Sequence, residues 1–195
     1  KLADKIYLMD VEAPRVAKHC EPGQFVIVKM DDKGERIPLT ICDYDREEGT
    51  ITIVFQTVGA STEKMAQLKA GDSFRDFVGP LGCPSEFVEE DIEELKKKKY
   101  LFVAGGVGTA PVYPQVKWLK EHGIDVDVIT GSKTKDLLIL EKEMEAVAGN
   151  LYCSMYFLLF LLSECDAVAE SFDDFGLVHP GYSGVFCRCL VRHAH

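Results

Sequence analysis

Three closely spaced glycines are the clearest sign of chemistry in this sequence. Gly105, Gly106 and Gly108 follow the apolar run "YLFVA" and precede a segment with helical periodicity. Glycine allows a tight turn and lets a ligand approach the main chain, and the free N–H groups at a helix start attract phosphate. The residue order therefore predicts a pyrophosphate-binding turn, although many tight strand-to-helix turns bind no ligand.

This turn departs from the common dinucleotide-binding pattern G-x-G-x-x-G. Gly106 and Gly108 supply the first two glycines, and Pro111 stands in place of the third. In dinucleotide-binding folds an acidic residue follows about 20 positions later and binds the ribose. Asp125 and Asp127 have that separation. They lie at the start and middle of the expected strand, so we interpret them as charges at the strand's edge.

A second short glycine-containing segment follows that strand. Gly131, Ser132 and Lys133 lie at its carboxyl end, where nucleotide contacts are expected. Ser132 and Lys133 could meet a ribose or a 2′-phosphate, and they could equally form a polar turn before the next helix. One lysine is little positive charge for a 2′-phosphate, which favours NAD over NADP.

The second half of the chain alternates between strand and helix patterns. Residues 99–106 form a continuous apolar strand, as in a parallel sheet buried on both faces. A helix over residues 108–123 follows, with its regular part starting at Pro114. A strand over residues 124–131 and a helix over residues 134–149 complete the pattern. This order predicts a Rossmann-like parallel-sheet domain, incomplete at the C-terminus.

The first half of the chain has the pattern of short strands. Residues 24–30, 37–45 and 50–56 are rich in β-branched residues and are separated by polar or glycine-containing turns. Such spacing predicts a small antiparallel β-barrel or sandwich. Residues 61–72 predict a short helix with a Ser or Thr cap, and residues 73–82 end in a Gly-Pro turn.

Bulk properties limit the class of protein. The chain has 195 residues and a net charge of −10, which argues against non-specific nucleic-acid binding. Its longest apolar run, residues 151–162, is shorter than the roughly 20 residues of a membrane-spanning helix and predicts a buried strand or helix. Seven cysteines without a C-x-x-C pair or a signal peptide predict a reducing, cytoplasmic setting. The chain begins with Lys1 rather than Met, so we expect that an N-terminal piece is missing.

Four motifs in this order resemble the ferredoxin-NADP reductase superfamily: "GERIPLTICDYD", "TIVFQTVGASTEKM", "VGPLG" and "LFVAGGVGTAPVYPQVKWLK". They look most like the small flavin subunit of NAD-dependent ferredoxin:NADP oxidoreductase, also named the sulfide dehydrogenase β-subunit. That subunit is related to the dihydroorotate dehydrogenase B electron-transfer subunit. The likeness covers Lys1 to about Leu151 and implies a barrel that binds FAD and an α/β domain that binds NAD or NADP.

The implied division of the chain places an FAD-binding β-barrel at residues 1–88 and a linker at residues 89–99, where an acidic block is followed by a basic one. A partial NAD(P)-binding α/β domain would occupy residues 100–150. Residues 151–195 form an atypical tail without an assignment.

The resemblance implies that Pro38, Leu39 and Thr40 line the flavin ring. An extended strand can offer alternating N–H and C=O groups to the polar edge of that ring, and Thr40 adds a hydroxyl near flavin N5. Many relatives carry an arginine where this chain has Ile37, and Arg36 lies one residue early. Because a one-residue slip reverses the face of a strand residue, we do not expect Arg36 to contact the pyrophosphate.

The segment "VGAST" resembles the family's loop under the flavin pyrophosphate, with Gly59, Ser61 and Thr62 as its contacts. An ordinary Ser or Thr helix cap is a compatible interpretation, because caps and phosphate sites use the same unpaired N–H groups. FAD and the nicotinamide carry out the hydride step themselves, so no catalytic side chain is expected. The residues implied to hold the nicotinamide nucleotide are Gly105, Gly106, Val107, Gly108, Thr109, Ala110 and Pro111.

The family pattern stops after Leu151. Relatives continue with a third strand, further α/β structure and a C-terminal loop whose cysteines bind a [2Fe-2S] cluster. Because the pattern ends within an expected strand, we hypothesise that the tail is out of frame. The nicotinamide site of this chain would then be incomplete, whereas the barrel could still hold FAD.

The cysteines of the tail do not have the close spacing of cluster ligands. Cys187 and Cys189 are separated by one residue and Cys165 is distant, so no [2Fe-2S] ligand set is expected here. His193 and His195 near these cysteines could suggest a metal site. The irregular spacing at a chain end favours an ordinary tail instead.

The resemblance and the residue patterns together favour a flavoprotein electron-transfer subunit. Hydride would pass from NAD(P)H to FAD, and electrons would continue to a larger flavin or iron–sulfur partner subunit. One alternative is the dihydroorotate dehydrogenase electron-transfer subunit, and another is a non-catalytic nucleotide-binding or scaffold module. Neither a nucleic acid nor a membrane is an expected partner.

Overall fold

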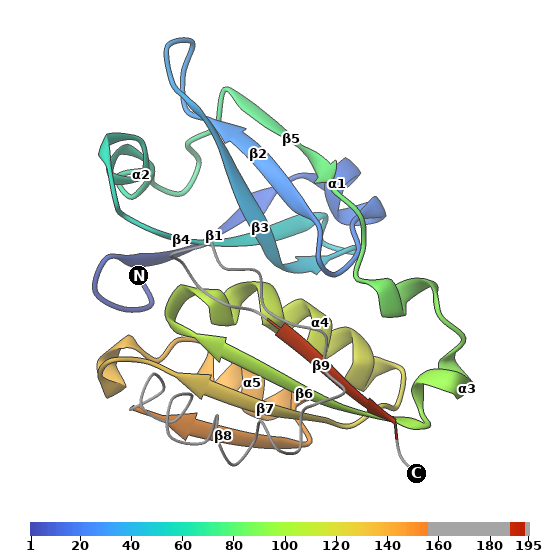
Figure 1. The fold of residues 1–195 in the computed structure, drawn as a ribbon. Helices are drawn as coiled ribbons and strands as arrows, with labels where there is room; N and C mark the ends of the chain where they lie inside the picture. Colours follow the sequence, from blue (N-terminus) through green and yellow to red (C-terminus); the bar gives the residue numbers. More distant parts are fainter. Residues whose placement is uncertain (156–187, 194–195) are drawn as a thin grey trace, which may run out of the picture.

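The computed structural model describes residues 1–155 and the backbone of residues 188–193. The described residues form a five-stranded antiparallel sheet followed by a four-stranded sheet with helices (Figure 1). This arrangement confirms the predicted fold class, an antiparallel barrel followed by a Rossmann-like parallel-sheet domain. We call the two parts the barrel unit and the nucleotide unit.

The barrel unit has the spatial strand order β1-β4-β3-β2-β5, and all neighbouring strands are antiparallel. Ile51, Ile53 and Phe55 point into its core and are at most 2% exposed, as their alternation predicts. The strands are β1 (Ile6–Glu12), β2 (Phe25–Lys29), β3 (Arg36–Asp45), β4 (Thr50–Gln56) and β5 (Asp76–Leu81).

Two short helices accompany these strands, α1 (Pro14–His19) and α2 (Ala60–Met65). The predicted helix over residues 61–72 is therefore wrong in its extent. Gly59 is the N-cap of α2, rather than a Ser or Thr residue. Beyond Met65 the chain makes turns, and Gly71 adopts a left-handed φ of +94° that a helix does not permit.

The nucleotide unit has the strand order β8-β7-β6-β9 (Figure 1). β6 (Lys98–Gly105), β7 (Val126–Gly131) and β8 (Asn150–Ser154) are parallel, whereas β9 (Arg188–His193) runs antiparallel along the other edge of β6. The apolar run at residues 151–162 thus begins as a strand. Tyr152 is 56% exposed, so the described part of this run is not buried as predicted. Residues 156–162 lie outside the described residues.

Two helices of the nucleotide unit start elsewhere than predicted. α4 (Thr109–Glu121) begins five residues before Pro114. Pro114 lacks an N–H, but its helix is held by a buried apolar face that includes Val112, Val116 and Leu119, each 0% exposed.

α5 (Glu141–Val147) begins seven residues later than the predicted start at residue 134. Leu137, Ile139 and Leu140 instead pack between the two units, and Leu140 adopts a left-handed φ of +56° that interrupts any helix.

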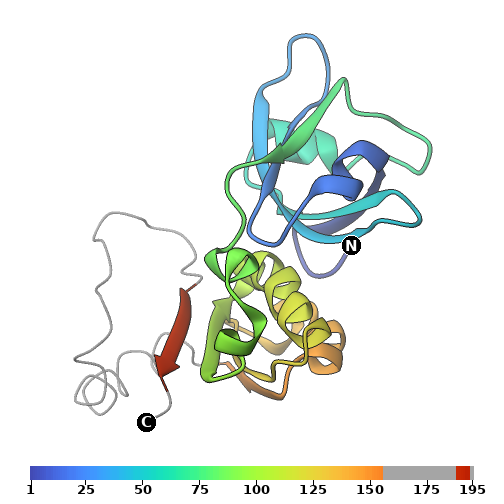
Figure 2. The ribbon, with the colours of Figure 1, turned by 90° about the vertical axis from the view of Figure 1, so that its right-hand side faces the viewer.

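The segment between the two units contains a single-turn helix, α3 (Ile92–Leu95), whose N-cap Asp91 accepts hydrogen bonds from the N–H groups of Glu93 and Glu94. Leu95 is fully buried, and Phe87 just before α3 packs on Trp118 of α4. Figure 2 shows this segment leaving the barrel unit and running along the nucleotide unit. The boundaries given above for the two domains and the linker remain a prediction.

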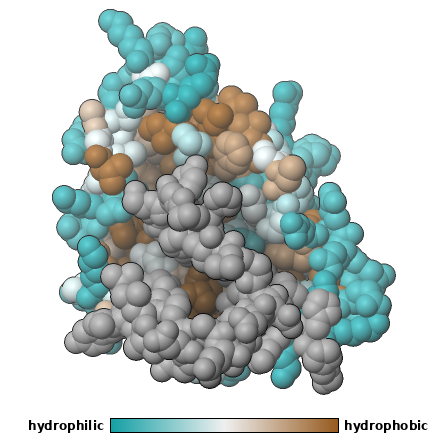
Figure 3. Space-filling model, in the orientation of Figure 1, coloured by the Kyte–Doolittle hydropathy of each residue, from teal (hydrophilic) through white to brown (hydrophobic). Residues whose placement is uncertain are grey.

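None of the helices in the described part of the chain is long and apolar enough to cross a membrane. On the face shown in Figure 3, hydrophilic residues dominate the rim, and apolar residues gather over the barrel unit. Val78 of β5 is one exposed apolar residue, at 48%.

Candidate cofactor site

A cavity of about 420 Å³ lies where the barrel unit meets the nucleotide unit. Its barrel wall comes from β3, from the end of β4 and from the loop into α2. Its other wall comes from the glycine turn and the first turn of α4. The lining residues are Ile37, Pro38, Leu39, Thr40, Val54, Phe55, Gln56, Val58, Thr62, Val107, Gly108, Ala110 and Pro111.

The β3 segment that lines this cavity is paired along one edge. β2 pairs with β3 over Arg36–Thr40, whereas β4 pairs with β3 only from Ile41 to Asp45. Along Pro38, Leu39 and Thr40, main-chain groups on the second edge are therefore not used by β4. Such a strand can present N–H and C=O groups to the polar edge of a flat ring. The structure thus places these three predicted residues together in one wall.

Thr62 lies beside β3 in the cavity wall and holds the preceding loop. Its Oγ1 accepts hydrogen bonds from the N–H groups of Val58 at 3.0 Å and Gly59 at 3.2 Å, and donates to the Gly59 carbonyl at 3.0 Å. The N–H of Gly59 is therefore occupied by a side chain of its own helix. A Cβ at Gly59 would meet no atom within 4 Å, so the loop surface there is open.

Ser61 points away from this cavity. Its hydroxyl donates to Glu35 at 3.0 Å, beside a separate hollow of about 210 Å³ between the β2–β3 turn and α2. Lys64, on the same helix, pairs with Asp31 at that hollow. Of the three residues predicted in the loop and helix start, only Thr62 lines the larger cavity.

The glycine turn forms the opposite wall. Gly105 ends β6, Gly106 to Gly108 form a single 3₁₀ turn, and Thr109 begins α4. Only Gly106 needs the conformational freedom of glycine, with a φ of +56° and open space where a Cβ would be.

The residues around Gly106 differ in which way they face. Val107, Gly108, Ala110 and Pro111 line the cavity, whereas Gly105, Gly106 and the buried Thr109 do not. Both walls are therefore supplied largely by the segments that the sequence singled out.

The second predicted nucleotide segment lies at the same edge of the sheet but outside this cavity. Gly131 pairs with Gly105 at the ends of β7 and β6. The Ser132 N–H donates to the Ser154 carbonyl, and its hydroxyl donates to the Thr134 carbonyl. Lys133 is exposed. Ser132 therefore serves the polar turn that the sequence offered as one of two interpretations.

The two aspartates near the start of β7 are far from the glycine turn along the strand. Asp125 pairs with Lys120 at 2.8 Å, and Asp127 accepts a hydrogen bond from Asn150 at 2.8 Å. Both aspartates are therefore engaged by polar neighbours on the sheet rather than placed at the glycine turn, in agreement with their interpretation as ordinary strand charges.

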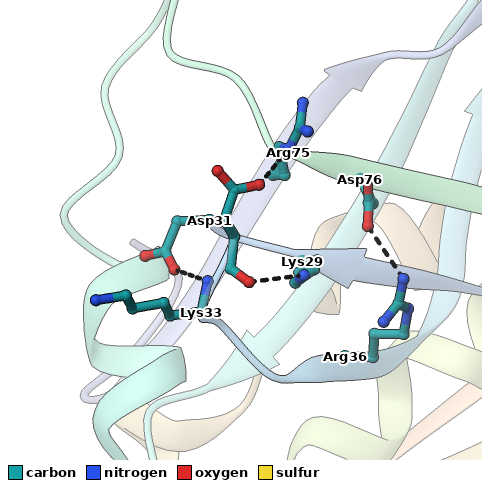
Figure 4. A network of polar contacts seen from close by, with 7 residues as sticks. Lys29, Asp31, Lys33, Arg36, Arg75 and Asp76 are labelled. Atoms are coloured by element: carbon teal, nitrogen blue, oxygen red, sulfur yellow. Dashed lines mark hydrogen bonds and ion pairs between the residues drawn. The ribbon is translucent and has the colours of Figure 1, made fainter.

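Two arginines near β3 pair with carboxylates away from the cavity (Figure 4). Arg36 pairs with Asp76 at 3.4 Å, and Arg75 pairs with Asp32 at 2.8 Å. Arg36 does not line the cavity, in agreement with its one-residue offset. Among the described residues the cavity lining contains no charged side chain, which suits an apolar aromatic ring edged by main-chain groups.

Several lining residues were not predicted from sequence. Val54 and Gln56 lie on β4, and Val58 in the next loop is 82% exposed. The alternation of β4 assigned one face to the barrel core and left the other face without a role. On this second face Val54 packs in the cluster between the units and is only 6% exposed.

Within residues 1–155, where side chains are described, no group of His, Cys, Asp or Glu side chains could hold a metal ion. Cys189 and His193 belong to β9, of which only the backbone is described. Cys165, Cys187 and His195, which also entered the metal and cluster predictions, lie outside the described residues.

Comparisons with known proteins agree with this geometry. A Clostridium beijerinckii protein named "Uncharacterized protein in adh 3'region" is 67% identical over 152 residues, 78% of this chain and 51% of that protein. The Thermotoga maritima "Dihydroorotate dehydrogenase B (NAD(+)), electron transfer subunit homolog" is 41% identical over 77% of this chain and 51% of its own length. The chain is therefore similar to proteins named as dihydroorotate dehydrogenase B electron transfer subunits. No protein-family model matches it.

A solved structure is similar to this chain as well. The structure of an NADH-dependent reduced ferredoxin-NADP oxidoreductase, studied for flavin-based electron bifurcation, is 35% identical to this chain and superposes with a TM-score of 0.74. The match covers 89% of this chain and 61% of the chain in that structure. The expected resemblance to the ferredoxin-NADP reductase superfamily is thereby confirmed. The chain spans about half the length of the curated relatives that it matches.

Proposed function

We propose that this chain is a flavoprotein electron-transfer subunit that takes hydride from NAD(P)H and passes electrons to a larger partner subunit. The observation that carries the proposal is the shared cavity. Strand β3 at Pro38–Thr40 and the glycine turn before α4 come from different units of the fold, yet they line one space of about 420 Å³. Two cofactor rings that must exchange a hydride need such a common space.

FAD, when bound, would supply the hydride-accepting and electron-passing chemistry. The residues of this chain would bind and orient it. Main-chain groups of Pro38, Leu39 and Thr40 would meet the polar edge of the ring, and the loop held by Thr62 would support its pyrophosphate, with Gly59 and Ser61 nearby. Apolar side chains such as Leu39 and Val54 would exclude water from the ring.

The nicotinamide nucleotide would lie against the other wall. Its pyrophosphate would approach Gly106 and the N–H groups at the start of α4, and its ring would meet the flavin near Val107, Gly108 and Pro111. Gly131 and the exposed Lys133 lie at the same sheet edge and would meet its ribose, whereas Ser132 closes the turn between β7 and the next segment. No side chain acid or base is required, because the hydride moves directly between the cofactors.

Anaerobic titration of the purified chain with NADH, and separately with NADPH, tests this proposal. We expect a yellow protein whose flavin absorption bleaches, at lower concentrations of NADH than of NADPH. A colourless protein that takes up no added FAD would contradict the proposal and favour a non-catalytic scaffold module.

The partner subunit is a second part of the proposal. Several relatives are named electron transfer subunits of dihydroorotate dehydrogenase B, and the similar solved structure is a ferredoxin-NADP oxidoreductase. The word subunit in the names of the relatives supports a partner subunit for this chain. Affinity purification of the chain from its native cells would identify that partner. Recovery of the chain without any second protein in comparable amount would contradict the proposed partner subunit.

A further inference from the structure

An ion pair joins the two units close to the cavity. Lys117 of α4 and Asp43 of β3 approach to 2.7 Å between Nζ and Oδ1, and their side chains are only 31% and 28% exposed. Another lysine of the same helix behaves differently, because Lys120 pairs with Asp125 inside the nucleotide unit. Lys117 therefore ties α4 to the barrel, whereas Lys120 does not.

A β-bulge turns Asp43 toward α4. The pairing of β3 with β4 shifts register between Ile41 and Asp43. Ile41 packs in the barrel core, Cys42 packs in the apolar cluster between the units, and Tyr44 packs against the barrel core again. Regular alternation would have returned Asp43 to the face of Ile41. The extra residue lets Cys42 and Asp43 both face α4, and bulges commonly re-aim a side chain in this way.

The surroundings of the pair are apolar. Cys42 is 1% exposed and packs in one cluster with Ala110 at the start of α4, and Tyr113 packs against that cluster. Burial, helped by the nearby Asp43 carboxylate, raises the pKa of the Tyr113 hydroxyl to about 12. An ion pair beside such a surface is screened less by water than one on an open surface.

Both members of the pair are rigidly connected to the cavity. Asp43 follows Thr40 on β3 by three residues, and Lys117 follows Pro111 on α4 by six. Each element therefore carries one wall of the cavity at one end and one charge of the pair at the other. A change in the angle between the elements would move the two walls apart.

We propose that Lys117 and Asp43 act as a clasp between the units, a pair of positioning residues that keeps the two walls of the cavity at a fixed separation. The consequence for hydride transfer rests on the function proposed above. The clasp itself does not, because it concerns only the contact between the two units.

Thiol labelling of the full chain, followed by peptide mass spectrometry, tests the clasp directly. Cys42 is buried between the units and reports their opening, whereas Cys20 is buried within the barrel core and reports barrel unfolding. In Lys117→Ala we expect Cys42 to react roughly fivefold faster while Cys20 is unchanged, since a part-buried ion pair biases local opening by about this factor. The matched control Lys120→Ala should label like the wild type.

Exchanging the two charges of the pair provides a second test of the clasp. Lys117→Glu should label at Cys42 at least as fast as Lys117→Ala, and adding Asp43→Lys should restore protection. Unchanged Cys42 protection in Lys117→Ala and Lys117→Glu would overturn the clasp. Equal acceleration of Cys42 and Cys20 would also overturn it, because the pair would then stabilise the barrel rather than the contact.

Rapid-mixing reduction of the flavin-loaded protein by NADH separates positioning from binding. In Lys117→Ala we expect the limiting rate of flavin reduction to fall, with flavin content and the dissociation constant for NADH retained. A weaker NADH affinity at an unchanged limiting rate would overturn the positioning role. Failure of the wild type to bind flavin would instead refute the proposed function, and the Cys42 labelling would still decide on the clasp.

Discussion

Gly105 and Gly131 lie opposite one another at the carboxyl ends of β6 and β7, where both parallel strands stop. In parallel α/β sheets this edge is where ligands bind, because the loops after successive strands meet there. The segment after Gly105 turns into the cavity at the barrel, and the segment after Gly131 stays at the sheet edge. One dinucleotide bound along this edge could reach both, which makes the turn at Gly106 the position to test first.

Gly106→Ala should weaken NADH binding without loss of the flavin. Gly106 has a φ of +56° and Gly123, at the end of α4, has a φ of +74°, and in both cases a Cβ would meet no atom within 4 Å. Alanine at either position should therefore lower the free energy of unfolding by about 1 kcal/mol, the penalty of a left-handed alanine. Denaturant unfolding measures this effect.

The two variants should differ in coenzyme binding. The new methyl group of Gly106→Ala would occupy the approach to the pyrophosphate, so we expect about tenfold weaker NADH binding, equivalent to about 1.4 kcal/mol. Gly123→Ala should bind NADH normally. If both variants bind NADH equally well, the glycine turn does not hold the coenzyme.

Thr62→Val should weaken flavin binding. The substitution removes the hydroxyl that accepts hydrogen bonds from Val58 and Gly59, and each such bond contributes about 1 kcal/mol to the order of the loop. We expect flavin affinity to fall about fivefold or more by fluorescence titration. Thr62→Ser keeps the hydroxyl and should retain the flavin.

Ser61→Ala is the matched control on the same helix. Ser61 hydrogen-bonds Glu35 beside the separate hollow, so flavin affinity should change little. A large loss in Ser61→Ala with none in Thr62→Val would show that the pyrophosphate lies on the other side of α2.

The strand pattern was readable from sequence because alternation and burial coincide. The strand at residues 50–56 places Ile51, Ile53 and Phe55 in the barrel core as predicted. The apolar run from residue 99 becomes the central strand β6, although only its face with Tyr100, Phe102 and Ala104 is buried among the described residues, rather than both faces as predicted. Helix boundaries were less predictable. The helix α5 starts only at Glu141 because Leu137, Ile139 and Leu140 pack between the units, a tertiary contact that local sequence does not reveal.

The same limit applies to the candidate site. The strand at Pro38–Thr40 and the glycine turn could be identified because they resemble known motifs, and the structure brings them together. The second face of β4, including Val54, could not be assigned, because nothing in an alternating strand says what covers its outer face. The bulge at Cys42 is equally hidden, since a residue added to one strand has no signature in residue type.

Phe87→Ala should destabilise the nucleotide unit, although residue 87 precedes the predicted linker. The Phe87 ring packs on Trp118 with centroids 5.3 Å apart and is 6% exposed. Its removal should lower the free energy of unfolding by about 3 kcal/mol. Trp118 is the only tryptophan of the chain, so its emission in the folded protein should shift to longer wavelength.

Met65→Ala is the control in the barrel core. Met65 is fully buried but packs in the barrel cluster, away from Trp118. This variant should lose stability of similar size and keep the native emission of Trp118. An unchanged emission in Phe87→Ala would indicate that the energetic boundary between the units follows residue 88, as the sequence predicts.

Raising the pH above 9 should destabilise the protein through its buried thiols. Burial, as the main cause, raises the pKa of Cys42 from 9.0 to about 12 and that of Cys20 to about 11. A group whose pKa is raised in the folded state binds its proton more tightly there than in the unfolded state. Its contribution to stability is therefore complete below pH 9 and is lost as the pH rises toward the folded-state pKa.

Cys42→Ala should flatten this dependence. Between pH 9 and pH 11 the wild type should lose up to about 1.4 kcal/mol per pH unit through Cys42 alone, measured as the free energy of unfolding in denaturant at fixed pH values. Cys42→Ala should be less stable at pH 8, because a small cavity replaces the thiol, but its stability should fall less steeply with pH. Cys83→Ala, at an exposed thiol, should keep the wild-type slope. Parallel slopes for wild type and Cys42→Ala would mean that Cys42 ionises equally easily in the folded and unfolded states, which a thiol enclosed between the two units should not do.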